Sequence, residues 1–229
     1  MISIIIPVLN EKENLKALLM PLQKWRQHGH EIILVEGGGD EQSERLSKRL
    51  VDVFIHASPG RARQMNAGAA MAKGSDLLFL HADTRLPAGA EQALLQFSQI
   101  ESAQWGFFDL RLAGRPGIFR VIETMINWRS SLTCIATGDQ AIFVRNSVFR
   151  ALQGYADIPL MEDVEICRRL KKRTRPIIVP MAVLTASRRW EVNGVIKTIL
   201  LMWLLRLSYY LGVSPQRLVR AYYPDTDYS

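Results

Sequence analysis

Short apolar runs alternate with segments of helical periodicity along the first 86 residues. Residues 2–8 form a β-branched run of strand length, and residues 12–27 follow with apolar positions at the spacing of a helix. The same alternation predicts, in chain order, strand 31–35, helix 42–50, strand 51–57, helix 60–74 and strand 77–80. We expect Gly74 to be the C-cap of the Ala-rich helix before it. Nearly continuous apolar strands that alternate with helices predict a parallel sheet covered on both faces.

The regular alternation ends after Leu86. The pattern then predicts, in order, helix 88–101, strand 105–112, helix 117–133, a turn, strand and helix within 138–152, a loop and helix within 159–173, strand 177–184 and helix 194–213. No internal repeat, low-complexity segment or clear linker interrupts this pattern. The chain is therefore expected to be an α/β protein with flanking helices.

Polar side chains follow each strand of the first half. They are Asn10 and Glu11, Glu36 and Asp40, Arg61 and Arg63, and His81 and Asp83. In parallel sheets of this kind, ligands bind beyond the carboxyl ends of the strands. We therefore expect these side chains to converge on one site.

Charge and cysteine content narrow the class of protein. The formal net charge of +7 suits nucleic acid, anionic lipid or a phosphorylated substrate. The basic run at 168–175 has no interleaved aromatic residues, which argues against nucleic acid and favours a solvated helix face. Cys134 and Cys167 are too far apart for a compact metal or redox motif and indicate reduced thiols in a cytosolic protein. The N-terminus lacks the basic segment of a signal peptide.

Two motifs could bind phosphate. The turn "VEGGGD" after the second strand could hold phosphate through backbone N–H groups, or it could be a tight turn that uses glycine for its conformation. It matches neither the dinucleotide-binding fingerprint nor a Walker loop. Arg61 and Arg63 could meet a diphosphate, or they could belong to a solvated basic turn.

Two further motifs place acids where chemistry could use them. Asp83 in "HADT" is well placed for a hard divalent cation, and His81 would shift the preference from Mg²⁺ toward Mn²⁺. Hydrogen-bonded turn capping is the alternative. In "MEDVE", Glu162 or Asp163 could have a raised pKa and act as a general base. The alternative is that these acids only compensate the dipole of the helix N-terminus.

The order of four motifs resembles family 2 glycosyltransferases of the GT-A fold. The motifs are "SIIIPVLNE", "GRARQMNAGAAMAKGSDLLFLHADT", "GDQAIFV" and "EDVEICRRLKK", and the resemblance spans about residues 2–190. "FLHADT" and "SRRWE" are similar to one bacterial, arsenosugar-associated subgroup. The resemblance implies a Rossmann-like, mostly parallel central sheet in residues 1–190, with a donor half at about 1–86 and an acceptor half at about 87–190. Residues 191–229 would be an apolar helical extension.

The resemblance also implies a nucleotide-diphospho-sugar donor, a divalent cation (Mn²⁺ or Mg²⁺) and inverting transfer to an acceptor hydroxyl. Its motifs assign roles to residues of this chain. On the donor side, Pro7, Asn10 and Glu11 would line the nucleotide pocket, Glu36 would contact the base or ribose, and Arg61 and Asn66 would face the diphosphate. Asp83 with His81 would bind the metal, and Asp163 beside Glu162 would be the general base. The acceptor would be bordered by Gly138, Asp139, Gln140 and Trp190.

Two positions depart from the family pattern. His81 stands where the family has the first metal-binding acid, which affects metal identity and affinity. Glu36 and the three glycines after it replace an Asp-Asp-Gly-Ser turn, so one carboxylate for nucleotide recognition is missing. The identity of the nucleotide does not follow from the resemblance.

The apolar tail predicts a helix that does not cross a membrane. Its charge-free core, 198–205, is eight residues long, whereas a membrane span needs about 20. Lys197 and Arg206 lie on opposite faces of such a helix. Packing within the protein, a homo-oligomer contact and a peripheral membrane contact all fit. We expect a cytoplasmic protein, with the inner face of the cell membrane as a further location.

Two other functions fit the same residues. A non-catalytic nucleotide-sugar-binding or membrane-associated protein would tolerate His81 in place of an acid. A nucleotidyltransferase would need a Gly-rich basic loop near the N-terminus, and "PVLNEKEN" lacks one. The acceptor and the sugar cannot be identified from the sequence.

Overall fold

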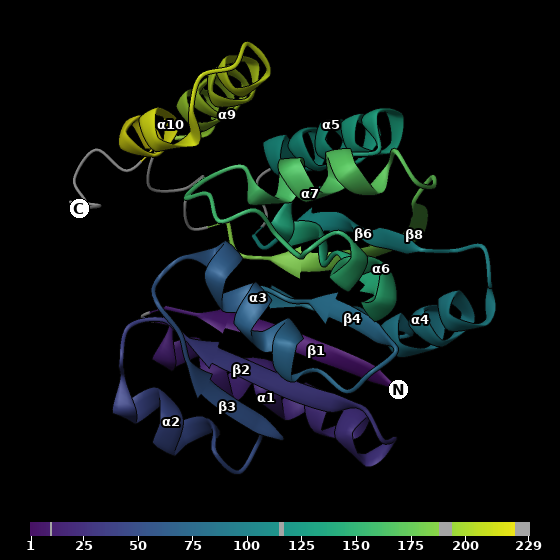
Figure 1. Ribbon diagram of the computed structural model, residues 1–229. Coiled ribbons are helices and arrows are strands. Elements are labelled where there is room, and N and C mark those ends of the chain that lie inside the picture. Colours follow the sequence, from purple (N-terminus) through teal and green to yellow (C-terminus); the bar gives the residue numbers. More distant parts are fainter. Residues whose placement is uncertain (10, 115–116, 188–193, 223–229) are drawn as a thin grey trace.

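A single eight-stranded sheet forms the centre of the molecule in the computed structural model (Figure 1). The structure describes residues 1–9, 11–114, 117–187 and 194–222. The strands are β1 (Ile2–Val8), β2 (Glu31–Glu36), β3 (Val53–His56), β4 (Asp76–Phe79), β5 (Thr84–Arg85), β6 (Trp105–Leu112), β7 (Phe143–Arg145) and β8 (Ile177–Thr185). The helices are α1 (Lys12–Gln27), α2 (Glu41–Ser47), α3 (Arg61–Met71), α4 (Ala90–Gln99), α5 (Gly117–Thr133), the 3-10 turn η1 (Gly138–Gln140), α6 (Asn146–Ala151), α7 (Glu162–Leu170), α9 (Val195–Tyr210) and α10 (Pro215–Tyr222).

The strand order is β3-β2-β1-β4-β7-β6-β8-β5. The first four strands are parallel, β7 is antiparallel to both of its neighbours, and β6 pairs in parallel with β8. β5 adds a short antiparallel edge to β8. The predicted α/β fold with a mostly parallel sheet and flanking helices is confirmed.

Two apolar cores cover the two faces of the sheet. Ile4 and Ile6 of β1 belong to the core that contains α1 and α4, whereas Ile5 belongs to the core that contains α3 and α7. Successive side chains of a strand point to opposite faces, so a strand that is covered on both sides must be apolar throughout. This explains the continuous apolar runs of the sequence.

The start of α3 is fixed over the ends of β1 and β2. The Gln64 side-chain amide donates to the carbonyl oxygens of Val8 (2.7 Å) and Val35 (2.9 Å). Further along α3, a Cβ on Gly68 would lie 2.6 Å from a methyl carbon of Ile5, so glycine permits the close approach of the helix to the sheet. These contacts place Arg61, the first residue of α3, at the carboxyl edge of the sheet.

The predicted C-cap at Gly74 is wrong. Helix α3 ends at Met71 with Ala72 as its C-cap. Gly74 lies in the connection to β4, where its N–H donates to Ser3 Oγ at 2.8 Å and an added Cβ would lie 2.5 Å from that oxygen. The glycine serves close packing against β1 rather than helix termination.

The helix predicted for 194–213 is confirmed as α9, and a second helix, α10, follows it. Helix α9 ends at Tyr210, Gly212 adopts a positive φ of 88°, and α10 begins at Pro215. Leu205 of α9 and Leu218 of α10 are buried in the core that contains α3 and α7. None of the helices described is long and apolar enough to cross a membrane.

Candidate active site

A pocket opens beyond the carboxyl end of β4, between the start of α3 and the C-terminal helices. Its walls come from the start of α3, the turn after β4, η1, the start of α7, and helices α9 and α10. The lining residues are Arg61, His81, Thr137, Gly138, Asp139, Leu160, Met161, Glu162, Asp163, Met202, Leu205, Arg206 and Tyr222. The expected convergence of Arg61 and His81 on one site is thus seen in the fold.

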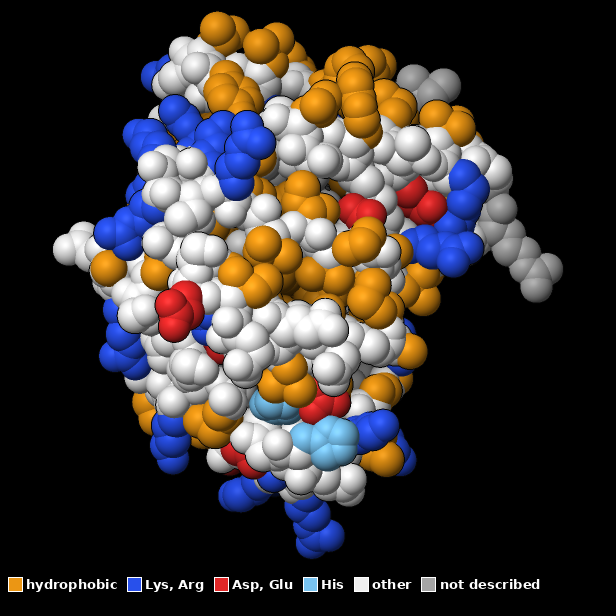
Figure 2. Space-filling view, turned by 90° about the vertical axis from the view of Figure 1, so that its right-hand side faces the viewer, with side chains coloured by type: hydrophobic (Ala, Val, Ile, Leu, Met, Phe, Trp, Pro, Cys, Tyr) orange, Lys and Arg blue, Asp and Glu red, His pale blue; other side chains and the backbone are white. Residues whose placement is uncertain are grey.

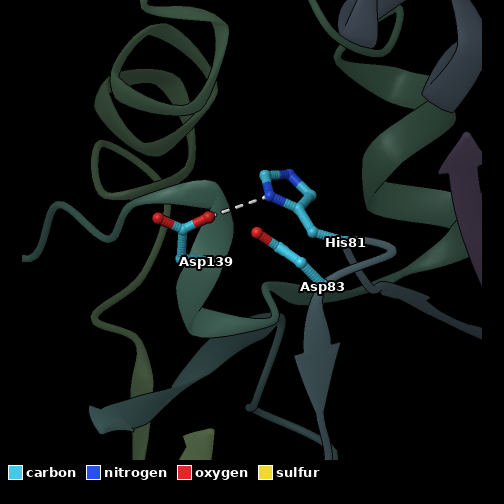
Figure 3. Close-up of side chains that lie close together, drawn as sticks. All are labelled: His81, Asp83 and Asp139. Carbon is cyan, nitrogen blue, oxygen red and sulfur yellow. Dashed lines mark hydrogen bonds and ion pairs between the residues drawn. The ribbon is translucent and has the colours of Figure 1, made fainter. Parts of the chain in front are cut away.

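One histidine and two carboxylates form a cluster in this region (Figure 3). One potential ligand atom from each of His81, Asp83 and Asp139 lies within 4.8 Å of the others. His81 Nδ1 is 3.0 Å from Asp139 Oδ1. Partial burial, and then the negative charge of Asp139, raise the pKa of Asp83, while His81 and Arg61 oppose the rise. This is the electrostatic setting in which a cation would be favourable.

The turn η1 determines how Asp139 meets His81. Gly138 lies so close to the imidazole that an added Cβ would be 2.4 Å from His81 Cε1. Thr137 and Gln140 form a capping box around the turn, and the Gln140 side-chain amide also donates to the Phe108 carbonyl oxygen at 3.2 Å. A glycine at this position is therefore required for the His81–Asp139 contact.

Two acids that begin helix α7 also line the pocket. Burial, and then the nearby Asp163 carboxylate, raise the pKa of Glu162 to about 7. Burial also raises the pKa of Asp163, but two backbone N–H groups oppose the rise. These donors are Gly138 N at 3.0 Å and Val164 N at 2.7 Å. Asp163 is thus oriented by η1, the same turn that presents Asp139.

Arg61 is the cation shared by both groups of acids. Its charge lowers the pKa values of Asp83, Glu162 and Asp163 against the effects of burial. Arg63, two residues later, does not line the pocket and pairs with exposed Asp157 at 2.8 Å. The two arginines of the sequence motif therefore have different surroundings.

Several predicted donor-side residues make structural hydrogen bonds. Fully buried Glu36 accepts from the backbone N–H groups of Gly38 (2.8 Å), Gly39 (2.5 Å) and Asp40 (3.1 Å), which shapes the glycine turn. The Asn66 amide holds both the N–H and the carbonyl oxygen of Tyr155. Their proposed roles toward the donor stay predictions.

The other assigned residues have varied positions. Pro7 is buried in β1, and Glu11 is near enough to Asp83 to raise its pKa. Gln140, assigned to the acceptor, is fully buried and accepts from Ser130 Oγ at 2.8 Å. Asn10 and Trp190 lie outside the described residues.

The C-terminal wall of the pocket was not predicted. Met202, Leu205 and Arg206 of α9 and Tyr222 of α10 all line it. Arg206, like Lys197, interrupts an apolar helix, and a cation within such a helix is the signal that could have indicated a site. Partly buried Arg129 of α5 was also missed, and its pKa is lowered by burial despite the nearby Asp163.

Comparisons with known proteins give a family match and similar proteins. The sequence model of "Glycosyl transferase family 2" matches residues 3–143. An undecaprenyl-phosphate 4-deoxy-4-formamido-L-arabinose transferase of Pectobacterium carotovorum is 31% identical over 108 residues, covering 42% of this chain and 33% of the relative. The protein of the same name from Pseudomonas savastanoi pv. phaseolicola is 32% identical over 97 residues, covering 38% of this chain and 29% of the relative. The chain thus matches about a third of each curated relative.

Solved structures show the same fold. S. aureus TarS, residues 1–349, has a TM-score of 0.64 and 14% identity, with 82% of this chain and 61% of that chain covered. The TarS complex with UDP-GlcNAc gives the same TM-score and identity over 81% of this chain and 58% of the other. This likeness establishes the architecture alone.

Proposed function

The chain belongs to glycosyl transferase family 2, and from that premise we propose that it transfers a sugar from a nucleotide-diphospho-sugar to an acceptor hydroxyl. The observation that supports this most directly is the residue content of the pocket lining. Arg61, His81 and Asp139 line it together with the acids Glu162 and Asp163. Transfer of this kind needs positive charge for a leaving diphosphate and a base for the attacking hydroxyl.

We assign the donor diphosphate to the Arg61 side of the pocket. A guanidinium can bind two phosphate oxygens at once and keeps its charge. Pro7, Asn10, Glu11, Glu36 and Asn66 belong to the same proposed donor side. The TarS complex named for UDP-GlcNAc makes uridine nucleotides the first donors to test.

We further propose that the cluster of His81, Asp83 and Asp139 holds the divalent cation. Two carboxylate oxygens and one imidazole nitrogen form a mixed donor set that suits Mn²⁺ and also admits Mg²⁺. Asp139 supplies the second carboxylate where the family's first metal acid is replaced by His81. When bound, the cation would neutralise charge on the diphosphate oxygens. We therefore assign Asp139 as a ligand of the cation, in place of the acceptor role that its sequence motif implied.

We propose Asp163 as the general base of an inverting reaction. Its two backbone donors, Gly138 N and Val164 N, fix the carboxylate at the pocket wall. Glu162 is the second candidate, because its pKa of about 7 is closer to the value that suits a base at neutral pH. Substitution of each acid separately distinguishes the two.

The acceptor is proposed to enter beside η1 and α9. The names of the curated relatives include undecaprenyl phosphate, so a polyprenyl phosphate is the first acceptor class to test. Trp190 stays in the proposed acceptor group. Assignment to the arsenosugar-associated subgroup and a cytoplasmic location are also proposals.

Thermal shift with nucleotide diphosphates and nucleotide sugars, with and without Mn²⁺ or Mg²⁺, tests the proposed function. Selective stabilisation by one donor should depend on the cation and increase with RT ln(1 + [L]/Kd). Arg61→Gln should abolish most of the shift, whereas the matched control Arg63→Gln should retain it. Stabilisation without donor hydrolysis or sugar transfer would instead favour a nucleotide-sugar-binding protein, and no stabilisation by any donor would contradict the proposal.

A further inference from the structure

Helix α5 has a second apolar face that the fold does not bury. Phe119 and Ile122 pack inward with β6. A different set of large apolar side chains points outward, namely Ile118, Val121, Met125, Trp128 and Leu132. Their spacing of three and four residues places them in one stripe along the helix. Trp128, at 67% exposure, is the most exposed of them.

Helix α9, like α5, has one side that packs inward and another that exposes large apolar side chains. Its inward side includes Thr198 and Leu205, which are buried. Its outward side and the residue after its end expose Leu200, Trp203, Leu204, Leu207, Tyr210 and Leu211. The two outward sets comprise eleven of the nineteen exposed large hydrophobic residues in the described part of the chain. We call them together the α5–α9 apolar face.

The two stripes belong to neighbouring helices. Val195 and Ile199 of α9, together with Ile126 of α5, pack against the small core beneath α5. In the space-filling view, hydrophobic side chains gather along the top of the molecule, the side where the ribbon view places α5 and α9 (Figures 1 and 2). An exposed apolar surface of this extent marks an interaction site.

The charges on the helices that form and adjoin this face are almost all positive. Helices α5, α9 and α10 contain six basic residues, which are Arg120, Arg129, Lys197, Arg206, Arg217 and Arg220. Their only acid is Glu123, which pairs with Arg120 at 2.8 Å. Lys197, Arg217 and Arg220 are exposed. An apolar face bordered by cations suits an anionic surface, and it disfavours a second copy that would bring the same cations together.

We propose that the α5–α9 apolar face binds the surface of an anionic lipid membrane. Leucine, methionine and tryptophan side chains would enter the headgroup boundary, where tryptophan is preferred. The surrounding lysine and arginine side chains would contact acidic headgroups. Both helices would lie in the interface, in agreement with the absence of a membrane-crossing helix among those described.

Membrane binding would bring the pocket close to the lipid surface. The opposite side of α9 contributes Met202, Leu205 and Arg206 to the pocket lining. An acceptor carried in the membrane would therefore reach the catalytic acids from the α9 side. This consequence rests on the proposed function, whereas the membrane binding itself does not.

Vesicle flotation of the full chain tests the proposal without any turnover. The probes are vesicles of phosphatidylglycerol mixed with phosphatidylcholine, and vesicles of phosphatidylcholine alone. We expect binding to the mixed vesicles that weakens in high salt. Trp128→Gln combined with Trp203→Gln should lower the partition coefficient at least about tenfold. The matched control, Met20→Gln with Leu46→Gln, replaces exposed apolar residues of α1 and α2 and should bind like the wild type.

A second double variant separates the contribution of charge to vesicle binding from the contribution of apolar contact. Lys197→Gln with Arg220→Gln should weaken binding to mixed vesicles by at least about tenfold, because each cation near an anionic surface contributes about 1 kcal/mol. Circular dichroism and thermal melting of every variant confirm that it is folded. Equal binding to both kinds of vesicle, equal binding of the tryptophan and control variants, or a dimer that only the tryptophan variant breaks would overturn the proposal. Donor binding by thermal shift is read separately, so the two proposals can fail independently.

Discussion

At the scale of single residues, the two acids that open α7 differ in how the protein holds them. Asp163 accepts hydrogen bonds from two backbone N–H groups, which stabilise its ionised form against burial. The pKa of its neighbour Glu162 is raised to about 7 by burial and by the Asp163 charge. A carboxylate that two backbone donors orient is suited to accept a proton from a bound hydroxyl.

Asp163→Asn should therefore lower turnover at least about a hundredfold while leaving donor affinity near normal, because a general base contributes about 10²–10⁴-fold. Steady-state kinetics and donor titration measure the two effects. Glu162→Gln is the comparison, and it should retain more activity. A near-normal rate for Asp163→Asn together with a large loss for Glu162→Gln would transfer the role of base to Glu162.

A separate prediction concerns the proposed cation-binding cluster of His81, Asp83 and Asp139. Asp83→Asn and Asp139→Asn should each weaken Mn²⁺-dependent donor binding about tenfold or more, because each removes a charged oxygen from a cluster that spans 4.8 Å. Isothermal titration with and without Mn²⁺ measures the difference. Asp157→Asn, which alters an exposed carboxylate paired with Arg63, is the control. Donor affinity that does not respond to Mn²⁺ in the wild type would exclude the cation role.

At the scale of secondary-structure elements, the short turn η1 contacts both the His81 cluster and the acids of α7. It presents Asp139 to His81 and donates a backbone hydrogen bond to Asp163. Its glycine allows the imidazole to approach, since any side chain would meet the ring. A three-residue element thus positions side chains from the turn after β4, from η1 and from α7 relative to one another.

Gly138→Ala should consequently move His81 and weaken cation-dependent donor binding. The new Cβ would lie 2.4 Å from His81 Cε1, and overpacking of this kind costs about 1–3 kcal/mol of stability. Chemical denaturation and donor titration check both effects. Gly117→Ala is a matched control, because an added Cβ there has no atom within 4 Å. Equal behaviour of the two variants would show that η1 tolerates the side chain.

At the scale of the whole molecule, the raised pKa of Glu162 links stability to pH. The folded protein holds this proton up to a pH of about 7, whereas an ordinary carboxyl releases it near 4.5. The folded state is therefore destabilised relative to the unfolded chain as the pH rises from about 4.5 to about 7. This shift corresponds to about 3 kcal/mol.

Glu162→Gln should remove most of that pH dependence. Denaturant melts at pH 5 and pH 8 should show a smaller loss of unfolding free energy in the variant than in the wild type, by about 2–4 kcal/mol. The comparison of the two proteins reports on Glu162 together with its neighbour Asp163, because the buried acids outside this pair titrate alike in both proteins. An identical pH dependence would mean that Glu162 is ionised at the same pH in the folded and unfolded chain.

The sequence by itself determined the elements whose signals are local. The strands at β1, β2 and β4, the helices between them and the acids at the start of α7 follow from periodicity, because alternation and helical spacing are properties of adjacent residues. The sequence also placed the motif "HADT" correctly at the end of a strand. The Gly74 cap was wrong because long-range packing against Ser3 overrides local propensity.

Only the tertiary structure decided which distant residues meet. Asp139 reaches His81 across 58 residues of chain because β7, which follows η1, inserts beside β4 in the sheet. The same arrangement places α9 and α10 along the pocket and leaves the outward stripes of α5 and α9 uncovered by the other described elements. Periodicity identifies an apolar face but not the partner that buries it, since the partner depends on strand order and helix placement. Local sequence motifs therefore identify the chemical groups of the site. The distances between those groups, and the exposed apolar stripes of α5 and α9, depend on the fold.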